Sequence, residues 1–390
     1  MKELSNQLIN LPPSATMAVT NKAAALRAAG RDVIALAGGD PDFATPQHIV
    51  DAAFAAIQNG ATHYAAPSKG TVPAVEAIAA KYERDTGVSV NPGSQIIVTP
   101  GGKWGINLAL GALVNPGDEV MVLEPVWVSY VPLIRLQGGV PIGVSLPSER
   151  NFEVTKAQLD AHVSPKTKAI MVNSPCNPTG RVLTQGEIDA IVAFAIEHDL
   201  YVIYDELYEH LIYDGEHLPL GGLPGMAERT ITINGLSKAY AMTGWRLGWM
   251  VGPESVMKLA GKLHGQTITC ATTYGMDAIV AALNGSHDIV WEMRDSYRAR
   301  RDFMVEALNA IEGIECRSIE GAFYLFPRFT KTALNSAELA TALLEQAEVA
   351  GTPGIAFGAA GKGHLRFSIA TAMHDLERAV ERMARVVPQL

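Results

Sequence analysis

Short runs of β-branched and apolar residues recur along the middle of the chain, and segments with a helical spacing of apolar residues separate them. Several runs are apolar on both faces, as a strand must be when helices cover both sides of its sheet. This alternation predicts α/β units around a largely parallel sheet. The strands are expected at residues 95–100, 119–124, 140–146, 168–174, 200–206 and 229–235.

The best-marked helix is expected at residues 184–199, between two of these strands. Thr184 and Glu187 form the pattern of a capping box at its start. Its apolar residues recur at the helical period and predict one buried stripe. The stripe consists of Ile188, Ile191, Val192, Ala195 and Ile196.

The two ends of the chain differ from the middle. A helical pattern covers residues 16–30, and from about residue 285 the chain becomes helical and more charged. An amphipathic helix is expected at 375–387, marked by Leu376, Ala379, Val380, Met383 and Val387. We therefore predict a large central domain, residues 46–284, and a smaller domain that joins residues 1–45 to residues 285–390.

Composition narrows the class of protein. Of the 390 residues, 48% are apolar and 18% are charged, which is typical of a globular chain with a large buried core. The net charge of −9 argues against a nucleic-acid partner. No apolar run approaches the roughly 18 residues that cross a bilayer, and the start lacks the apolar core of a secretory signal. A cytoplasmic protein without a membrane partner is expected.

Cysteine and histidine patterns give no sign of a metal. Cys176, Cys270 and Cys316 lie far apart and form no CxxC pair, and no HExxH sequence occurs. Residues 209–217, EHLIYDGEH, contain two histidines, and we interpret them as a polar loop and not as a metal site.

The strand ends carry the residues that could perform chemistry. In doubly wound sheets, ligands bind beyond the carboxyl ends of the strands. Here those ends supply glycines, polar groups, aromatic rings and charges, which predicts one shared pocket. The segments are GGKWG (101–105), PVWVSY (125–130), PCNPTG (175–180), DELY (205–208) and GLSK (235–238).

Three of these segments suggest a particular cofactor. The glycine-rich turn at 101–103 could bind a phosphate group or could be a plain strand–helix turn, and neither GxxxxGK[ST] nor GxGxxG is present. Asp205 and Lys238 on neighbouring strand ends would form a buried ion pair or a site for pyridoxal 5′-phosphate. That cofactor needs a lysine for its aldehyde and an acid for its ring nitrogen.

The chain resembles the class I aminotransferases of fold type I, and among them the bacterial aspartate and aspartate/prephenate subgroup. The resemblance implies an α/β large domain with a mostly parallel seven-stranded sheet between helices, and a small α+β domain formed by both termini. It runs nearly from end to end through GGDPDFATP (38–46), HYAAPSKG (63–70), PGGKWG (100–105), NSPCNPTG (173–180), YDELYEHL (204–211), SKAYAMTGWRLGW (237–249) and GHLRFSIA (363–370).

The resemblance implies a role for each matching residue in a site for pyridoxal 5′-phosphate. Lys238 would carry the covalent Schiff base and act as the base that moves the substrate proton. Asp205 would hold the ring nitrogen, and Asn177 and Tyr208 would bind the ring hydroxyl. Trp127 would stack on the ring. Lys238, Asp205 and Tyr208 are the expected catalytic residues.

The phosphate group of the cofactor would lie among Gly102, Lys103 and Arg246. Tyr64 would reach the phosphate of a neighbouring subunit, which implies a homodimer. At Gly235 the chain departs from many relatives, which carry a phosphate-binding serine there, and Ser237 directly precedes the lysine.

The resemblance also implies that the substrates are amino acids and 2-oxo acids. Arg366 would bind the substrate α-carboxylate in a bidentate geometry that lysine cannot copy. Gly39, Asn177 and Trp127 would complete this part of the site. Cys176, beside Asn177, is expected to be a small packed side chain and not a nucleophile.

The substrate side chain is harder to infer. No arginine lies between Arg246 and Arg294, where one branch of the family places a second substrate cation. In the subgroup resembled here, Lys103 would bind the distal carboxylate of aspartate or glutamate, with 2-oxoglutarate as a common acceptor. Trp104 and the segment 14–16 would instead suit aromatic or prephenate-like substrates.

Two further classes use the same cofactor. A carbon–sulfur lyase would need the same lysine and aspartate, so the sequence leaves this alternative open. A cofactor-binding transcription regulator would need an added basic domain, for which this chain has neither the length nor the charge.

Overall fold

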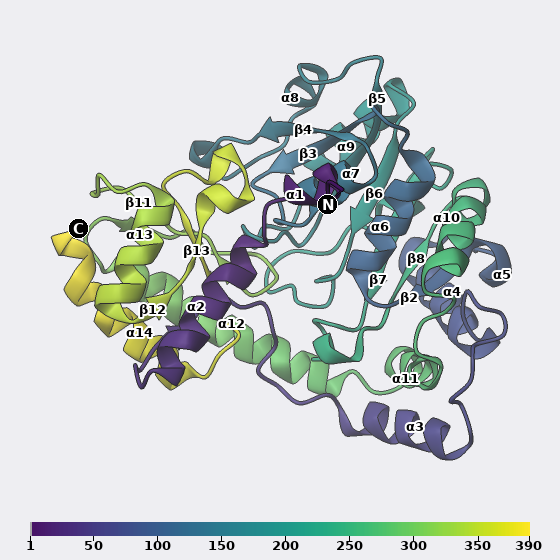
Figure 1. Ribbon diagram of the computed structural model, residues 1–390, viewed down its shortest axis with the longest axis horizontal. Helices are drawn as coiled ribbons and strands as arrows, with labels where there is room; N and C mark the ends of the chain where they lie inside the picture. The colour runs from purple at the N-terminus through teal and green to yellow at the C-terminus, as the bar shows by residue number, and fades with distance from the viewer. Residues whose placement is uncertain (1) are drawn as a thin grey trace.

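The computed structural model describes residues 2–390 and is built around one seven-stranded sheet (Figure 1). All six predicted strands are present. The seventh strand, β8, runs antiparallel between two neighbours, and the remaining pairs are parallel. In spatial order the strands are β2 (Ile96–Thr99), β8 (Gly248–Val251), β7 (Thr230–Gly235), β6 (Tyr201–Asp205), β5 (Thr167–Asn173), β3 (Glu119–Glu124) and β4 (Val140–Ser145).

Strand β8 was not predicted, because it is short and begins at a glycine in a glycine-containing run. That glycine is required by a close approach of chains. A Cβ atom on Gly248 would lie 2.8 Å from the carbonyl oxygen of Asn234 and 2.9 Å from the carbonyl carbon of Gly101. β8 therefore brings the end of β7 against the turn that follows β2.

Helices cover both faces of the sheet, as the apolar strands predict (Figure 1). Alternate residues of each strand enter different cores. On β6, Ile203 packs with the helices of one face, whereas Val202 and Tyr204 pack on the other. The first face carries α6 (Gly102–Leu113), α7 (Tyr130–Leu136) and α10 (Glu254–Thr267). The other carries α3 (Gln47–Gln58), α4 (Val72–Thr86), α8 (Lys156–Asp160), α9 (Gln185–Glu197) and α11 (Thr273–Asn284).

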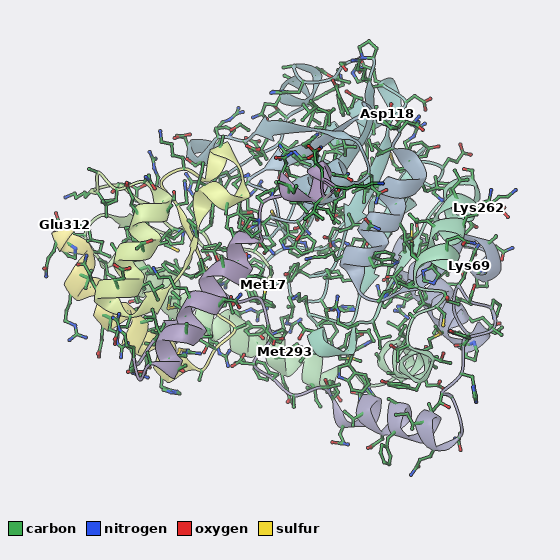
Figure 2. The ribbon with its side chains drawn as sticks, viewed as in Figure 1. Met17, Lys69, Asp118, Lys262, Met293 and Glu312 are labelled. Carbon is green, nitrogen blue, oxygen red and sulfur yellow. The ribbon has the colours of Figure 1, made fainter. Side chains whose placement is uncertain are left out.

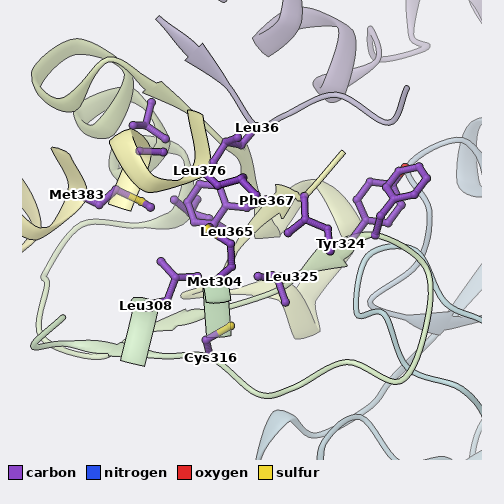
Figure 3. Packing of buried hydrophobic residues seen from close by; sticks show 14 of the residues in the cluster. Leu36, Met304, Leu308, Cys316, Tyr324, Leu325, Leu365, Phe367, Leu376 and Met383 are labelled. Carbon is purple, nitrogen blue, oxygen red and sulfur yellow. The ribbon is translucent and has the colours of Figure 1, made fainter. Parts of the chain in front are cut away.

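Both ends of the chain pack beside this sheet, in the purple and yellow-green part of Figure 1. Figure 3 shows their common core, where Leu36 from the first part of the chain meets Phe367 and Leu376 from the last. The division at residues 46 and 284 stays a prediction. The main helices here are α2 (Ala15–Ala28), α12 (Asp288–Asn309), α13 (Ser336–Ala342) and α14 (Met373–Val386), and the strands include β1 (Ile34–Ala35), β10 (Tyr324–Leu325), β12 (Val349–Ala350), β13 (Thr352–Pro353) and β14 (Leu365–Ser368).

Short side strands and turns complete the chain. The short helices are α1 (Asn6–Ile9) and α5 (Pro92–Gln95), and β9 (Ile314–Glu315) pairs with β11 (Arg328–Phe329). Within residues 2–390, every helix is too short or too polar to span a lipid bilayer.

Helix α9 confirms the capping box at its start. The Thr184 side chain accepts from the Glu187 amide, and the Glu187 carboxylate accepts from the Thr184 amide. Glu187 also receives two bonds from Arg181, at 2.7 and 2.9 Å, and one from the Val154 amide at 3.0 Å. Ile196 was expected in the buried stripe but is 44% exposed. Phe194 is buried instead, so the buried face of the helix is centred closer to Phe194 than the predicted stripe.

Neutralising Glu187 should destabilise the fold. Glu187→Gln leaves the buried Arg181 charge without its carboxylate, so the free energy of unfolding should fall by about 3 kcal/mol. Urea denaturation measures this change. The control Asp189→Asn neutralises an exposed acid on the same helix and should change stability by less than about 0.5 kcal/mol. Equal effects of the two substitutions would contradict the prediction.

Candidate active site

A cavity of about 180 Å³ opens at the carboxyl ends of the central strands, between the sheet and the terminal segments. Most of the predicted site residues line it, although they are far apart in the sequence. Figure 2 shows Met17 of α2, which also lines the cavity, between the two parts of the molecule. The predicted residues that line the cavity are Gly39, Lys103, Trp127, Asn177, Asp205, Tyr208, Lys238 and Arg366.

Lys238 follows β7 and is held by a neutral acceptor. Its Nζ atom donates to the carbonyl oxygen of Gly39 at 2.6 Å. Burial lowers the pKa of Lys238 to about 8, an effect that the charge of Asp40 offsets only in part. An amine that loses its proton near neutral pH is a usable nucleophile and base.

Asp205 ends β6 and is enclosed by donors. Its Oδ2 atom accepts from the Tyr130 hydroxyl at 2.6 Å, and its Oδ1 atom accepts from the Leu207 amide at 3.2 Å. Burial raises the pKa of Asp205 to about 6, although these hydrogen bonds act to lower it. Asp205 and Lys238 face the same cavity, and Lys238 donates to Gly39, so the first of the two alternatives, a direct ion pair, is not formed.

Arg366 lies on β14 and is only 2% exposed. Its guanidinium donates to the Asn177 side-chain oxygen at 2.8 Å and to the Ala37 carbonyl at 2.7 Å. The rings of Tyr324 and Phe357 lie 4.3 and 5.0 Å away. Its Nε atom has no hydrogen-bond partner among the described residues, and both acceptors are uncharged. A buried guanidinium with only neutral partners favours a bound anion.

Tyr208 connects the sheet to the terminal core. Its hydroxyl lies 3.0 Å from that of Tyr324, and burial holds the pKa of Tyr208 well above its usual range. Tyr324 lies at the edge of the core shown in Figure 3 and so reaches the cavity from the terminal part.

The turn after β2 forms a second positive region. Gly101 has a φ of 84°, and α6 starts at Gly102 with its amide groups unpaired within the helix. The Arg246 guanidinium packs against Gly101 and donates to the carbonyls of Thr243, at 2.8 Å, and Pro100, at 3.3 Å. A helix N-terminus beside a guanidinium favours an anion such as phosphate.

Gly235 is explained by crowding. A Cβ atom there would lie 2.8 Å from the Leu247 carbonyl oxygen and 2.9 Å from the Gly248 Cα, so a serine does not fit without movement. Ser237 is buried beside Lys238. Burial raises the pKa of the Cys176 thiol, which fits the expectation that it is not a nucleophile.

Tyr64 lies outside the cavity of its own chain. It is 80% exposed, on the loop between α3 and α4. It lines a separate surface depression with residues 270–274.

Sequence reasoning missed three residues that shape the site: Tyr130, Asn173 and Tyr324. Asn173 donates to the Asp205 carbonyl at 2.9 Å and accepts from the Asn177 amide at 2.8 Å. Tyr130 and Asn173 both lie in or beside the strand-end segments, so the sequence indicates their position near the pocket. It does not indicate their hydrogen-bond partners. Tyr324 follows no such segment, and its place depends on how the terminal part packs.

Comparison with known proteins identifies the family. The family model of aminotransferase class I and II matches residues 31–383. The chain is 42% identical to the aspartate/prephenate aminotransferase of Thermus thermophilus, covering 99% of both chains. It is 38% identical to the aspartate aminotransferase of Musicola paradisiaca, covering 100% of this chain and 98% of that relative. It is also 40% identical to an aromatic-amino-acid aminotransferase of Thermococcus litoralis, over 92% of each.

Solved structures agree. The Thermus thermophilus aspartate aminotransferase with maleate superposes with a TM-score of 0.95 at 42% identity, covering 99% of this chain and 100% of that one. An aromatic aminotransferase from Pyrococcus horikoshii gives a TM-score of 0.90 at 42% identity, over 95% and 98%. The chain belongs to the class I and II aminotransferases, a family that uses pyridoxal phosphate, and it is a transaminase with the expected α/β fold.

The raised pKa of Asp205 should make the stability of the ligand-free protein depend on pH. An acid with a higher pKa in the folded than in the unfolded state stabilises the fold below its unfolded pKa and loses that contribution as the pH rises. The native protein should therefore lose stability relative to Asp205→Asn by about 2 kcal/mol between pH 4 and pH 6. Urea denaturation of both proteins at each pH measures the difference, and a constant difference would contradict the assigned pKa.

Proposed function

We propose that the chain transfers the amino group of an acidic L-amino acid, aspartate or glutamate, to a 2-oxo acid such as 2-oxoglutarate. The two substrates would use one site in turn. The observation that carries this proposal is Arg366, a buried cation with only neutral partners that faces the cavity. A substrate α-carboxylate would supply the missing charge, and donor and acceptor share that group.

The residues present fit pyridoxal 5′-phosphate. Lys238 is a buried amine whose pKa lies near 8, and Asp205 is a buried carboxylate on the same cavity. The turn at Gly101 and Gly102 with Arg246 suits the phosphate, and Gly101 leaves room where a Cβ would lie 2.7 Å from the Arg246 guanidinium. When bound, the cofactor supplies an aldehyde carbon and an electron-accepting ring.

Each side chain then has a definite task. Lys238 would hold the cofactor covalently and, once released, would move a proton at the substrate α-carbon. Asp205 would keep a proton on the ring nitrogen, and Tyr130 keeps Asp205 oriented for this. Tyr208 and Asn177 would donate to the ring hydroxyl, and Trp127 would cover one ring face.

A homodimer is part of the proposal. Tyr64 is exposed and does not line the cavity of its own chain, so we assign it to the phosphate of a partner subunit. The cytoplasmic location inferred from the sequence stays a prediction.

The preference for acidic substrates depends on Lys103. Its Nζ atom lies 5.0 Å from the Trp127 ring centroid, on the cavity that also contains Arg366. Partial burial, and then the charge of Arg246, lower the pKa of Lys103, so an anionic ligand would stabilise its charged form. A relative crystallised with maleate, a dicarboxylate, supports two cationic contacts.

Aromatic or prephenate-like substrates form the second candidate, and one observation favours them. A larger cleft of about 540 Å³ adjoins the site beyond Lys103. Its walls include Leu11, Val128, Val131 and Ile355, which would accept an apolar ring. Relatives named for aromatic and for prephenate substrates support this candidate.

A half-reaction scan tests the function itself. The holoenzyme is mixed with one amino acid at a time, and the absorbance of the bound cofactor is recorded. A transaminase should change its spectrum with aspartate or glutamate alone and recover on addition of 2-oxoglutarate. Release of pyruvate and ammonia without any acceptor would instead indicate the carbon–sulfur lyase.

The role of Lys103 gives a separate prediction. Lys103→Ala should lower kcat/KM for aspartate about 10- to 100-fold, because one charge-assisted contact is lost. Turnover of phenylalanine should change much less, and Lys258→Ala, an exposed lysine on α10, serves as the matched control. Equal turnover of aspartate by the Lys103→Ala enzyme would favour the aromatic candidate.

A further inference from the structure

The segment 209–217, expected to be a polar loop, is irregular, but the side chains of Glu209 and His217 are largely shielded from solvent. Side chains alternate across β6, so Glu206 follows Tyr204 to the face opposite Asp205. The side chain of Glu206 is 6% exposed and that of Glu209 is 9% exposed. A charged cluster is therefore buried behind the strand end that carries the site.

Lys81 of α4 is the cation of this cluster. Its side chain is 5% exposed, and its Nζ atom lies 2.7 Å from Glu209 Oε1 and also pairs with Asp85. Burial acts to lower the pKa of Lys81, but Glu209 and Asp85 outweigh it and raise the pKa. Burial likewise acts to raise the pKa of Glu209, yet the charge of Lys81 lowers it to about 2. Both partners therefore stay ionised.

The same cluster has the outline of a metal site, since ligand atoms of Glu206, Glu209 and His217 lie within 4.8 Å of one another. Lys81 already provides the positive charge for Glu209. The Nε2 atom of His217 lies 3.3 Å from Glu206 Oε1, within ion-pair distance but without hydrogen-bond geometry. We therefore treat the cluster as an internal ion network. The other ionisable groups packed around it are Tyr82, Arg84, His210, Tyr240 and His287.

Tyr208 precedes Glu209 in the chain, and its own side chain contacts Phe323 and Tyr324. It lies in the stretch after β6, which continues as neither helix nor strand. Its backbone is held by turn bonds from the Glu209 amide to Glu206 at 3.0 Å and from the Leu211 amide to Tyr208 at 2.8 Å, and by bonds to Ile233 and Ala322 at its two ends. The next residue, Glu209, is the one fixed by Lys81. The ion pair therefore lies on one face of this stretch, while Tyr208 lines the cavity on the other.

We propose that Lys81 is a positioning residue, which fixes the Tyr208 hydroxyl for the cofactor by pairing with Glu209 behind the sheet. The inference rests on the proposed function, in which Tyr208 donates to the ring hydroxyl. Lys81 itself touches neither cofactor nor substrate.

A double-mutant cycle tests the inference. The variants are Tyr208→Phe, the pair Lys81→Met with Glu209→Gln, and Arg246→Lys at the phosphate end. The pair removes both charges together, so no unpaired buried ion remains on Lys81 or Glu209. The measurements are the dissociation constant for pyridoxal 5′-phosphate, the pH midpoint of the bound cofactor's absorbance, and thermal unfolding of each protein without cofactor.

Tyr208→Phe should weaken cofactor binding about tenfold. It should also raise the absorbance midpoint, because a donated hydrogen bond favours the ionised ring oxygen. The Lys81/Glu209 pair variant should produce the same two changes in the same direction. Adding Tyr208→Phe to the pair should produce no further change, since both act through one contact, whereas adding Arg246→Lys should multiply the losses. Lys81→Arg keeps the charge and should retain the native midpoint.

Glu209→Gln alone, which leaves Lys81 paired with Asp85, serves as a second variant if the pair variant does not fold. It should shift the midpoint in the same direction. A lowered melting temperature with an unchanged dissociation constant and midpoint would show a structural role only and overturn the inference. If Tyr208→Phe left the dissociation constant and the midpoint unchanged, the proposed role of Tyr208 would be contradicted, and the inference with it. A failure of the proposed function is thus distinguished from a failure of the inference about Lys81 alone.

Discussion

The buried guanidinium of Arg366 joins the sheet to the terminal part of this molecule. Arg366 sits on β14 in the terminal part, and its hydrogen bonds run to Asn177, from the loop after β5, and to Ala37. Removing a charge from water is costly unless a counter-charge or many hydrogen bonds replace the solvent. Here the described chain supplies neutral acceptors and two aromatic faces, so part of that cost is not offset by the described residues. The contact that joins the two parts therefore contains a buried positive charge whose hydrogen-bond acceptors are uncharged.

The sheet supplies the complementary chemistry at the other side of the cavity. Lys238 and Asp205 have pKa values moved toward neutrality from opposite directions, and burial is the first cause for both. Neither has the partner that would restore its ordinary charge, because Lys238 donates to a carbonyl and Asp205 accepts from a phenol and an amide. Groups in this condition exchange protons readily near pH 7, which is the property needed for proton transfer at carbon.

The sequence predicts the strands and helices better than it predicts the contacts between distant segments. Periodicity located six strands of the sheet and the capped helix α9, because these depend on local patterns of apolar residues. The expected pocket followed from topology, since parallel strands bring their carboxyl ends together. Strand β8 was not predicted, because its position depends on contacts of glycine residues between distant segments. The roles of Tyr130 and Tyr324 were not predicted, because local sequence spacing does not reveal hydrogen-bond partners that lie on other elements.

Residues 209–217 form an irregular, partly exposed loop, but composition does not reveal that Glu209 is almost fully buried beside Lys81. Asp205 and Glu209 are both buried carboxylates on one short segment, and burial opposes the charge of both. Their pKa values nevertheless differ, at about 6 for Asp205 and about 2 for Glu209. Asp205 accepts a hydrogen bond from the neutral Tyr130 hydroxyl, whereas Glu209 pairs with the Lys81 ammonium group. A neutral partner leaves Asp205 able to share a proton with a ligand, whereas Lys81 keeps Glu209 a permanent anion. The identity of the partner, more than burial, therefore separates the acid that can serve chemistry from the acid that holds the backbone.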